Sequence, residues 1–422
     1  MLDLKFIRNN VEKVKRAIEL KNDQADVDKL IELDVDKRKI LIKVEELKHQ
    51  RNTVSEEIGK MKKQKQDASE AIAKMRKVSN NIKELDEQVK RLDEQIYEIS
   101  IRIPNIPHSS VPEGKDETAN VEVKKWGILP EIDFQPLPHW EVGEKLGIID
   151  LAGGSKVSGS FFINYVGLGA RLQRALISFM LDLHIEKHGY TEVYPPYIVN
   201  RESMFGTGQL PKMEEDMYHA SVDDLFLIPT AEVPVTNLLR DQVLMGEKLP
   251  VRYTAYTPCF RREAGTHGKD TRGLIRIHQF DKVEMVNFVK PESSYNELET
   301  LLTNAEEVLQ LLDLPYRVLS LATGDLSFAA AKCYDIEVWA AGIGNWLEVS
   351  SCSNFEDFQA RRTNIRFKRT PSSKPEYVHT LNGSGLALPR TVIAILENYQ
   401  TDEGTIIVPQ VLRKYMGTDV IN

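Results

Sequence analysis

The chain has 422 residues, of which 41% are hydrophobic and 28% charged, values typical of a soluble globular protein with more than one domain. Its 55 Lys and Arg against 63 Asp and Glu give a net charge of −8, so a polyanionic partner requires a local basic patch. The three cysteines form no C-x-x-C pair, and no signal segment or bilayer-long apolar run is found. We therefore expect a cytoplasmic protein without structural disulfides or structural zinc.

Residues 1–103 have the pattern of long helices, with no proline and one glycine, Gly59. Heptad spacing of apolar residues in two runs predicts an antiparallel coiled-coil hairpin over about 28–103, after a first helix over 1–22. Each run covers roughly 35 residues, or about 50 Å of helix. Lys37 and Arg51 interrupt the first seam and are interpreted as positions that set the register. The apolar seam residues are Leu33, Ile40, Val44, Leu47, Val54, Ile58 and Met61, then Met75, Val78, Ile82, Leu85, Val89, Leu92, Ile96, Ile99 and Ile103.

The turn between these two helices is strongly basic. Residues 60–77 carry seven Lys and Arg against Asp67 and Glu70, about +5 on a chain of net charge −8. A basic end of this kind is suited to binding phosphate groups. The alternative is an oligomerising coiled coil whose charged end is simply solvated. Six of these cations are the candidate nucleic-acid contacts: Lys60, Lys62, Lys63, Lys74, Arg76 and Lys77.

The chain changes character near Pro104. Residues 104–135 are rich in Pro, Ser and charge and are interpreted as a connection to a second domain, 136–422. Apolar periodicity predicts a helix over 169–188, and TEVYPPYIV after it reads as a strand broken by Pro195 and Pro196. This helix and strand fit a surface that pairs with a second subunit.

The second domain has more strand candidates than crossover helices, with hairpin-type loops between neighbours. We therefore expect an α+β fold with a mostly antiparallel sheet flanked by helices. Neither a G-x-G-x-x-G nor a Walker A sequence occurs, so the two common nucleotide-binding loops are absent. The expected strands are Leu225–Ile228, Tyr253–Arg262, Leu274–Phe288, Tyr334–Val338, Gly344–Ser351 and Tyr377–Leu381.

The segment FRREAGTHGKDTRGLIRIHQFDKVE contains the most informative cluster of polar side chains. If two antiparallel strands flank a loop at 264–273, side-chain alternation places two arginines, two glutamates and one ring on a single face. Arginine suits phosphate oxygens, a ring can stack on a base, and a carboxylate can pair with an amine. This face therefore predicts ATP bound beside an amino acid. Its members are Arg261, Glu263, Arg276, Phe280 and Glu284.

This segment resembles motif 2 of the class II aminoacyl-tRNA synthetases. NGSGLALPRTVIAILENYQ resembles their motif 3, and the helix and broken strand at 170–197 resemble motif 1, the dimerisation element. With the helical hairpin and the TAE triplet at 230–232, the series is similar to seryl-tRNA synthetases of the bacterial type over essentially the whole chain. The resemblance implies an ATP-dependent, AMP-forming serine–tRNA ligase that acts as a homodimer.

The resemblance also implies a role for each matching residue. Arg261 would hold the α-phosphate and the amino acid carboxylate, and Glu263 would read the adenine amino group above Phe280. Arg276 and Arg390 would bind the γ-phosphate. The expected ATP site consists of these residues together with Arg262, Glu348, Val349, Ser350 and Ser351. Arg261, Arg276 and Arg390 are the expected catalytic residues.

The implied serine pocket and metal position complete the site. Serine would bind Thr230, Ala231, Glu232, Arg261, Glu284 and Ser384. Glu348 and Ser351 match the position of Mg²⁺, which would arrive with ATP. The expected partners are ATP, L-serine, serine tRNA and selenocysteine tRNA. The helical hairpin of the protein would bind the long variable arm of serine tRNA.

Two other functions are compatible with part of this pattern. The protein could be a synthetase-like ligase that loads an amino acid onto a carrier other than tRNA, although a basic-tipped arm argues against it. It could also be a non-catalytic RNA-binding paralogue, which would be expected to lose Arg261, Phe280 or Arg390, all of which are present.

Overall fold

The computed structural model describes residues 1–263 and 272–422. Most of the expected loop at 264–273 therefore lies outside the described residues. The chain forms two compact units. We call the first, Leu2–Glu19 with Asp23–Pro104, the arm unit, and the second, Met1 and Leu20–Asn22 with Asn105–Asn422, the sheet unit.

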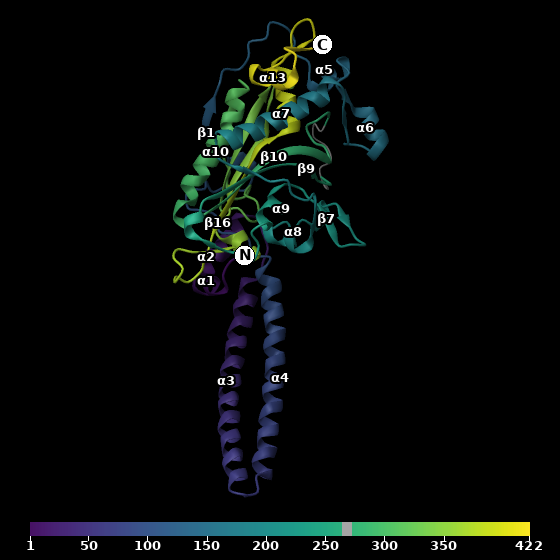
Figure 1. The fold of residues 1–422 in the computed structure, drawn as a ribbon. Coiled ribbons are helices and arrows are strands. Elements are labelled where there is room, and N and C mark those ends of the chain that lie inside the picture. Colours follow the sequence, from purple (N-terminus) through teal and green to yellow (C-terminus); the bar gives the residue numbers. More distant parts are fainter. Residues whose placement is uncertain (264–271) are drawn as a thin grey trace. The chain divides into compact units, whose positions relative to one another are not determined.

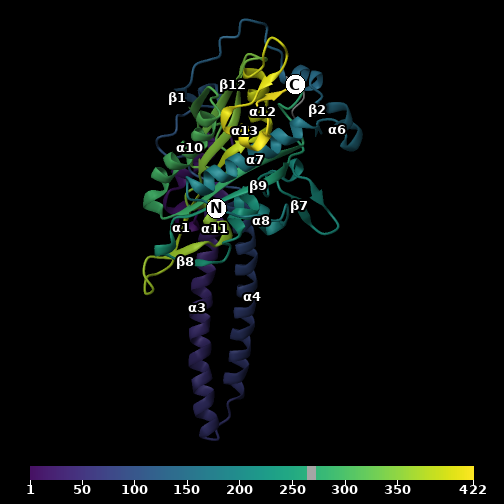
Figure 2. The ribbon, with the colours of Figure 1, turned by 45° about the horizontal axis from the view of Figure 1, so that its top comes forward.

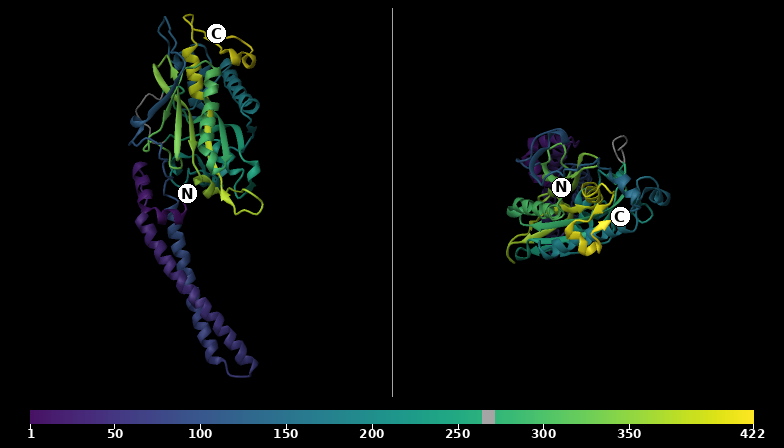
Figure 3. Two further views of the ribbon diagram at one scale, coloured as in Figure 1. Left: turned by 90° about the vertical axis from the view of Figure 1, so that its left-hand side faces the viewer. Right: turned by 90° about the horizontal axis from the view of Figure 1, so that it is seen from above.

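The arm unit is built around the predicted helical hairpin. Helices α3 (Val27–Lys63) and α4 (Ser69–Ser100) lie side by side along their lengths (Figures 1 and 3). Every apolar seam residue predicted above is buried or half-buried, as the heptad spacing requires. Lys37, a polar seam position, forms an ion pair with Asp93 of α4 and so links the two helices.

The opening segment of the arm unit corrects one prediction. Residues 1–22 do not form one helix but two, α1 (Leu4–Asn9) and α2 (Val11–Leu20). Asn10 ends α1, and its side-chain amide donates to the Phe6 carbonyl at 2.9 Å. Asparagine favours helix ends because its side chain competes for backbone hydrogen bonds.

An eight-stranded sheet forms the centre of the sheet unit. All neighbouring strands are antiparallel except β4 and β9, which confirms the predicted α+β fold. β1 lies within the expected connection and pairs with β11 as an edge strand. In spatial order the strands are β1 (Val121–Trp126), β11 (Tyr316–Ser320), β12 (Lys332–Ala340), β13 (Asn345–Asn354), β16 (His379–Ala387), β10 (Gln279–Val289), β9 (Val251–Phe260) and β4 (Thr191–Glu192).

Three helices cover one face of this sheet and enclose its core (Figure 2). They are α7 (Leu168–Glu186), α10 (Ser294–Leu311) and α12 (Leu388–Asn398). Met180 of α7, Leu301 of α10 and Ile395 of α12 are fully buried and belong to the same hydrophobic cluster as Met285 of β10. The opposite face of the central strands is thus left for polar side chains.

Smaller elements surround the sheet. Three short strands, β5, β7 and β6, form a separate sheet, and β15, β14 and β8 form another. Among the described residues, no helix is both long and apolar enough to cross a membrane. The remaining elements are α5 (His139–Lys145), β2 (Ile149–Asp150), α6 (Leu151–Ser158), β3 (Asn164–Tyr165), β5 (Ile198–Asn200), α8 (Arg201–Thr207), β6 (His219–Ala220), β7 (Leu225–Leu227), α9 (Glu232–Asn237), β8 (Val243–Met245), α11 (Phe358–Thr363), β14 (Arg366–Lys368), β15 (Glu376–Tyr377), β17 (Ile406–Ile407), α13 (Arg413–Met416) and β18 (Val420–Ile421).

Two strand ends differ from the sequence expectation. The ladder between β9 and β10 stops at the pair Phe260 and Gln279, so the expected strands extend too far toward the loop. Glu263 and Gly273 have positive φ angles of 51° and 70°, which no regular strand permits. Arg261 and Glu263 therefore lie beyond β9, and strand alternation does not by itself determine where they point.

Candidate active site

A cavity of about 580 Å³ opens on the polar face of the sheet. Its wall comes from β10, β13 and β16, the start of α12, and the segments that lead into α9 and follow β9. Twelve of the expected site residues line it and thus come together from distant parts of the sequence. They are Thr230, Glu232, Arg261, Glu263, Arg276, Phe280, Glu284, Glu348, Val349, Ser351, Ser384 and Arg390.

Strand β10 supplies three of the cavity residues by simple alternation. Phe280, Lys282 and Glu284 line the cavity, whereas Val283 and Met285 between and after them pack into the core. This is the period-two pattern expected of a half-buried antiparallel strand.

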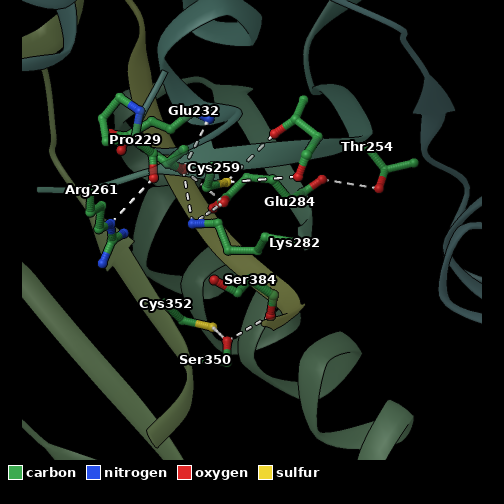
Figure 4. Close-up of polar contacts among 12 residues, drawn as sticks. Pro229, Glu232, Thr254, Cys259, Arg261, Lys282, Glu284, Ser350, Cys352 and Ser384 are labelled. Atoms are coloured by element: carbon green, nitrogen blue, oxygen red, sulfur yellow. Dashed lines mark hydrogen bonds and ion pairs between the residues drawn. The ribbon is translucent and has the colours of Figure 1, made fainter. Parts of the chain in front are cut away.

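The deepest part of the cavity is a buried polar cluster (Figure 4). The Lys282 ammonium lies 2.5 Å from a Glu284 carboxylate oxygen and donates to the Thr230 hydroxyl at 2.9 Å. That hydroxyl in turn donates to Glu284 at 2.9 Å. Because Lys282 occupies a lone pair of the hydroxyl, the Thr230 proton is directed to the carboxylate.

A second buried carboxylate, Glu232, borders this cluster. It accepts a hydrogen bond from the Gln359 side-chain amide at 2.6 Å. Burial, and next the nearby Glu284 carboxylate, raise the pKa of Glu232 to about 7. Two carboxylates, one of them with a raised pKa, thus face the Lys282 ammonium, and a ligand ammonium bound beside Glu232 would favour its ionised form.

Arg261 lies at the rim of the same cluster. Its Nε donates to the Pro229 carbonyl at 3.3 Å, and its guanidinium centre lies 5.2 Å from the centroid of the Phe280 ring. The remaining guanidinium nitrogens are thus presented beside the ring, in the geometry of a cation–π contact.

The other two cavity arginines are each paired with a carboxylate. Arg276 Nε donates to Glu263 Oε2 at 2.5 Å. Arg390 donates to the backbone carbonyl of Glu348 at 2.7 Å and lies 3.2 Å from its carboxylate. Each pair is at least partly exposed and can therefore exchange partners with a charged ligand.

A register shift in β13 places Glu348 and Ser351 together. Residues three apart face opposite sides of a regular strand. Here Ile336 of β12 pairs with Ser350 and Glu337 pairs with Glu348, which leaves Val349 as the additional residue of a bulge. Glu348, Val349 and Ser351 consequently all line the cavity.

A second register shift lies where β16 meets β10. Lys282 pairs with Ala387 and Glu284 with Ser384, so two residues of β10 span the length of three on β16. Ser384 and Ala387 both reach the cavity as a result.

Three expected site residues do not line the cavity. Ala231 is fully buried at the start of α9, and Arg262 is exposed. Ser350, on the core side of β13, donates from its hydroxyl to the Ser384 carbonyl at 2.6 Å. It supports the strand that carries Ser384 without facing the cavity.

Some polar residues of the site had no role predicted from sequence. Lys282 belongs to the alternating run and could have been found from that pattern. Asn382 lines the cavity from β16, two residues before Ser384, and the same alternation predicts its direction. Gln359 comes from the short helix α11, which carries no recognisable motif, so only the fold brings it to Glu232.

In the arm unit, all six candidate tRNA contacts are exposed. They lie on the last turn of α3 and the first three turns of α4. Three of them, Lys60, Lys62 and Lys63, lie in the last turn of α3, where the helix dipole favours cations.

Family comparisons cover both units. Residues 1–107 match the seryl-tRNA synthetase N-terminal domain, and residues 214–399 match the tRNA synthetase class II core domain of the G, H, P, S and T enzymes. A serine–tRNA ligase of Caldanaerobacter subterraneus is 58% identical over 100% of this chain and 99% of its own length. The chain belongs to the seryl-tRNA synthetase family.

Solved structures of the seryl-tRNA synthetase family agree with this. The enzyme of Pyrococcus horikoshii complexed with ATP is 42% identical, covers 100% of this chain and 99% of its own, and superposes with a TM-score of 0.95. A cytoplasmic serine–tRNA ligase of Naegleria fowleri in complex with AMP is 32% identical over 100% of this chain and 99% of its own, with a TM-score of 0.89.

Family membership decides between the functions left open by the sequence. The predicted activity, that of an ATP-dependent serine–tRNA ligase of class II, is confirmed by relatives that match over the full length. A ligase that loads another carrier and a non-catalytic RNA-binding paralogue are not favoured.

Proposed function

We propose that the cavity activates L-serine with ATP to seryl-adenylate, and that the basic tip of the arm unit holds serine tRNA for the transfer of the seryl group. The observation that carries this proposal is the buried cluster of Thr230, Glu232, Lys282 and Glu284 directly beside Arg261 and Phe280. The cluster offers carboxylates that can bind an amine. Beside it lie a cation and an aromatic ring that can bind a nucleotide.

Serine would fill the buried cluster. Its ammonium would bind beside Glu232 and favour the ionised form of that carboxylate, and its own carboxylate would face Arg261. The polar atoms of Thr230, Glu284 and Ser384 would pair with the hydroxyl. Glycine and alanine would leave these buried groups unpaired, which typically costs ~1–3 kcal/mol for each group.

ATP would lie along the outer part of the cavity. Adenine would stack on Phe280 with its amino group at Glu263, and the γ-phosphate would draw Arg276 and Arg390 from their present carboxylate partners. Arginine favours this exchange because phosphate oxygens accept two hydrogen bonds from its planar fork. Val349 would line this site, whereas Arg262 and Ser350 would act only as neighbours of the contacting residues.

The residues of the β13 bulge fit a magnesium ion bound with ATP. Mg²⁺ prefers oxygen ligands, takes one or two from protein, and completes its shell with water and phosphate oxygens. The Glu348 carboxylate and the Ser351 hydroxyl are oxygen donors on one cavity wall. Bound there, the ion would neutralise phosphate charge.

The reaction would need positioning and charge neutralisation, and no covalent enzyme intermediate. A serine carboxylate oxygen would attack the α-phosphorus while the bond to pyrophosphate breaks. Arg261 would contact both anions and offset their repulsion. Arg276 and Arg390 would stabilise the charge that develops on the leaving pyrophosphate.

The arm unit would recognise tRNA by its shape and phosphates. The long variable arm is an RNA helix, whose deep groove side chains cannot read. A hairpin about 50 Å long with exposed cations at its tip suits backbone contacts. Because backbone contacts depend little on sequence, we extend the proposal to selenocysteine tRNA.

We further propose a homodimer built on α7 and the segment that follows it. β4 is an edge strand, and Tyr194 and Ile198 beyond it are 78% and 52% exposed although apolar. A two-fold interface would cover them. Sedimentation of the protein should show a dimer at micromolar concentration; a monomer alone would refute this part.

ATP–pyrophosphate exchange with each of the twenty amino acids tests the activation step. Exchange should depend on serine and Mg²⁺ and proceed without tRNA, since all the proposed groups lie in the sheet unit. Aminoacylation of serine tRNA and of selenocysteine tRNA tests the transfer. Exchange with another amino acid in place of serine would contradict the assignment of the buried cluster.

A further inference from the structure

Helix α5 contacts the segment in which the chain returns to the cavity after residues 264–271. His139, at the start of α5, is fully buried. Its Nε2 accepts a hydrogen bond from the backbone amide of Leu274 at 3.0 Å. Leu274 lines the cavity together with Ile275 and Arg276.

The tautomer of His139 follows from these contacts. A backbone amide can only donate, so Nε2 must be the unprotonated nitrogen, and Nδ1 carries the hydrogen. Nδ1 lies 2.8 Å from Glu397 Oε1 and donates to it. Glu397, on α12, is also fully buried and thereby fixes which ring nitrogen is free to accept.

Glu397 is itself held by two backbone amides. The His139 amide donates to Oε1 at 2.9 Å and the Ile343 amide donates to Oε2 at 3.0 Å. Three donors on one buried carboxylate fix its orientation. The carboxylate, the imidazole and the Leu274 amide thus form one ordered chain.

Two further contacts join the same elements. Gly273 has a φ of 70°, and a Cβ atom on it would lie 2.3 Å from His139 Nε2, so only glycine fits between them. The Arg272 guanidinium centre lies 5.1 Å from the centroid of the Trp140 ring. Residues 272–274 are therefore contacted by two consecutive residues of α5.

The segment needs such support because it makes no strand ladder. β10 begins only at Gln279, so residues 272–277 lie outside the strand ladder, and the next residue, His278, is held by backbone hydrogen bonds with Arg261 and Phe161. Arg276 lies in this irregular segment, two residues after Leu274, and forms an ion pair with Glu263.

We propose that His139, oriented by Glu397, is a positioning residue for Arg276 and thereby for the terminal phosphate of ATP. This rests on the proposed function, in which Arg276 contacts that phosphate. Loss of the acceptor at Nε2 releases the Leu274 amide and lets the wall with Arg276 move. Binding of AMP, which has no γ-phosphate, does not depend on it.

The test uses the full-length protein and compares ATP with AMP binding by calorimetry. His139→Asn can retain a donor near Nδ1 but loses the acceptor at Nε2, whereas His139→Gln can place an oxygen near Nε2. We expect the Asn variant to bind ATP about tenfold more weakly, because a misplaced Arg276 weakens one charge-assisted contact to the terminal phosphate, with unchanged AMP affinity. The ATP affinity of the Gln variant should stay within about twofold of that of the unaltered protein.

Two comparison variants keep the outcome decisive. Arg276→Ala should show the same selective loss of ATP affinity. Gly273→Ala, which presses on His139 without altering a buried side chain, should show it as well, even if His139→Asn is unstable. Equal weakening of ATP and AMP, or equal behaviour of the Asn and Gln variants, would overturn the proposal. Serine-dependent exchange by the unaltered protein is measured separately, so a failure of the proposed function is seen on its own.

Discussion

The arm unit and the cavity use charge in opposite ways. At the tip of the arm, Lys62, Lys63 and Arg76 are exposed, and no proposed contact there is buried. In the cavity, Lys282 and Glu284 are nearly inaccessible, with 8% and 1% of their side chains exposed. Exposed cations act additively and are screened by salt, whereas each buried charge depends on its partners.

This difference separates recognition from chemistry within one chain. A tip of many equivalent charges tolerates the loss of one and responds to ionic strength. A cavity in which each buried group has a designated partner responds strongly to single substitutions and to pH. The predictions below test whether the two regions can be damaged independently.

The largest expected effect is in the cavity. Arg261→Ala should lower serine-dependent pyrophosphate exchange by about 10²–10³-fold or more, because a cation between two reacting anions is lost. Arg262→Ala is the matched control, since the neighbouring arginine is exposed and does not line the cavity. Similar rates for the two variants would refute the assignment of the α-phosphate position.

The second prediction concerns the arm tip. Changing Lys62, Lys63, Lys74 and Arg76 to Gln should raise the KM for serine tRNA by roughly 10–100-fold, and the salt dependence of KM should become shallower because fewer counterions are released. Exchange without tRNA should stay unchanged. Glutamine at four exposed cations farther from the tip, Lys43, Lys83, Lys90 and Arg91, is the control. Equal effects of both sets would mean that the tip has no special role.

The third prediction uses the raised pKa of Glu232. If the ionised carboxylate binds the serine ammonium, the KM for serine should fall about tenfold between about pH 6 and pH 8, because the ionised fraction rises through a pKa of about 7. Glu232→Gln should weaken serine binding and remove this pH dependence. The KM for ATP serves as the internal control; if it follows the same profile, another group is responsible.

The same pKa has a consequence for stability without serine. Above its unfolded pKa, Glu232 holds its proton more tightly in the folded protein, so stability is lost as pH rises from about 4.5 to about 7 and is then constant with respect to this group. The melting temperature of the unaltered protein, compared with that of Glu232→Gln, should therefore fall as pH rises across that interval. An increase would contradict the raised pKa.

The smallest effect on activity is expected from the seam of the arm. Ile82→Ala removes a side chain that is 5% exposed and should destabilise the hairpin by about 2–4 kcal/mol, with a moderate rise in the KM for tRNA. Ile42→Ala, at a residue 58% exposed, is the matched control and should change little. Circular dichroism of thermal unfolding distinguishes the two. A change in exchange without tRNA would show that the arm and the cavity are not independent.

The two regions also differ in how far sequence reasoning reaches. The heptad seam depends on residues close in sequence, so its buried positions, including Val44 and Ile82, could be predicted from spacing. Alternation likewise predicts Phe280 and Glu284 within β10. It does not apply to Arg276, which lines the cavity although it precedes the strand, or to Glu348 and Ser351, which share a wall only because of a bulge.

The helix break at Asn10 and the side-chain pairings between distant segments are still harder to predict from the sequence. Asn10 divides the opening segment by one side-chain hydrogen bond that no periodicity reveals. Gln359 and His139 reach the cavity wall through contacts between segments more than a hundred residues apart, Glu232 with Gln359 and His139 with Leu274. Such contacts become visible only when the fold is known.

A crystal structure with a non-hydrolysable seryl-adenylate analogue is the most direct test of the central claim. We predict the seryl ammonium at Glu232, the seryl hydroxyl at Glu284, the phosphate mimic at Arg261, and adenine on Phe280. Binding of the analogue with the seryl group outside the buried cluster, or with adenine away from Phe280, would contradict it.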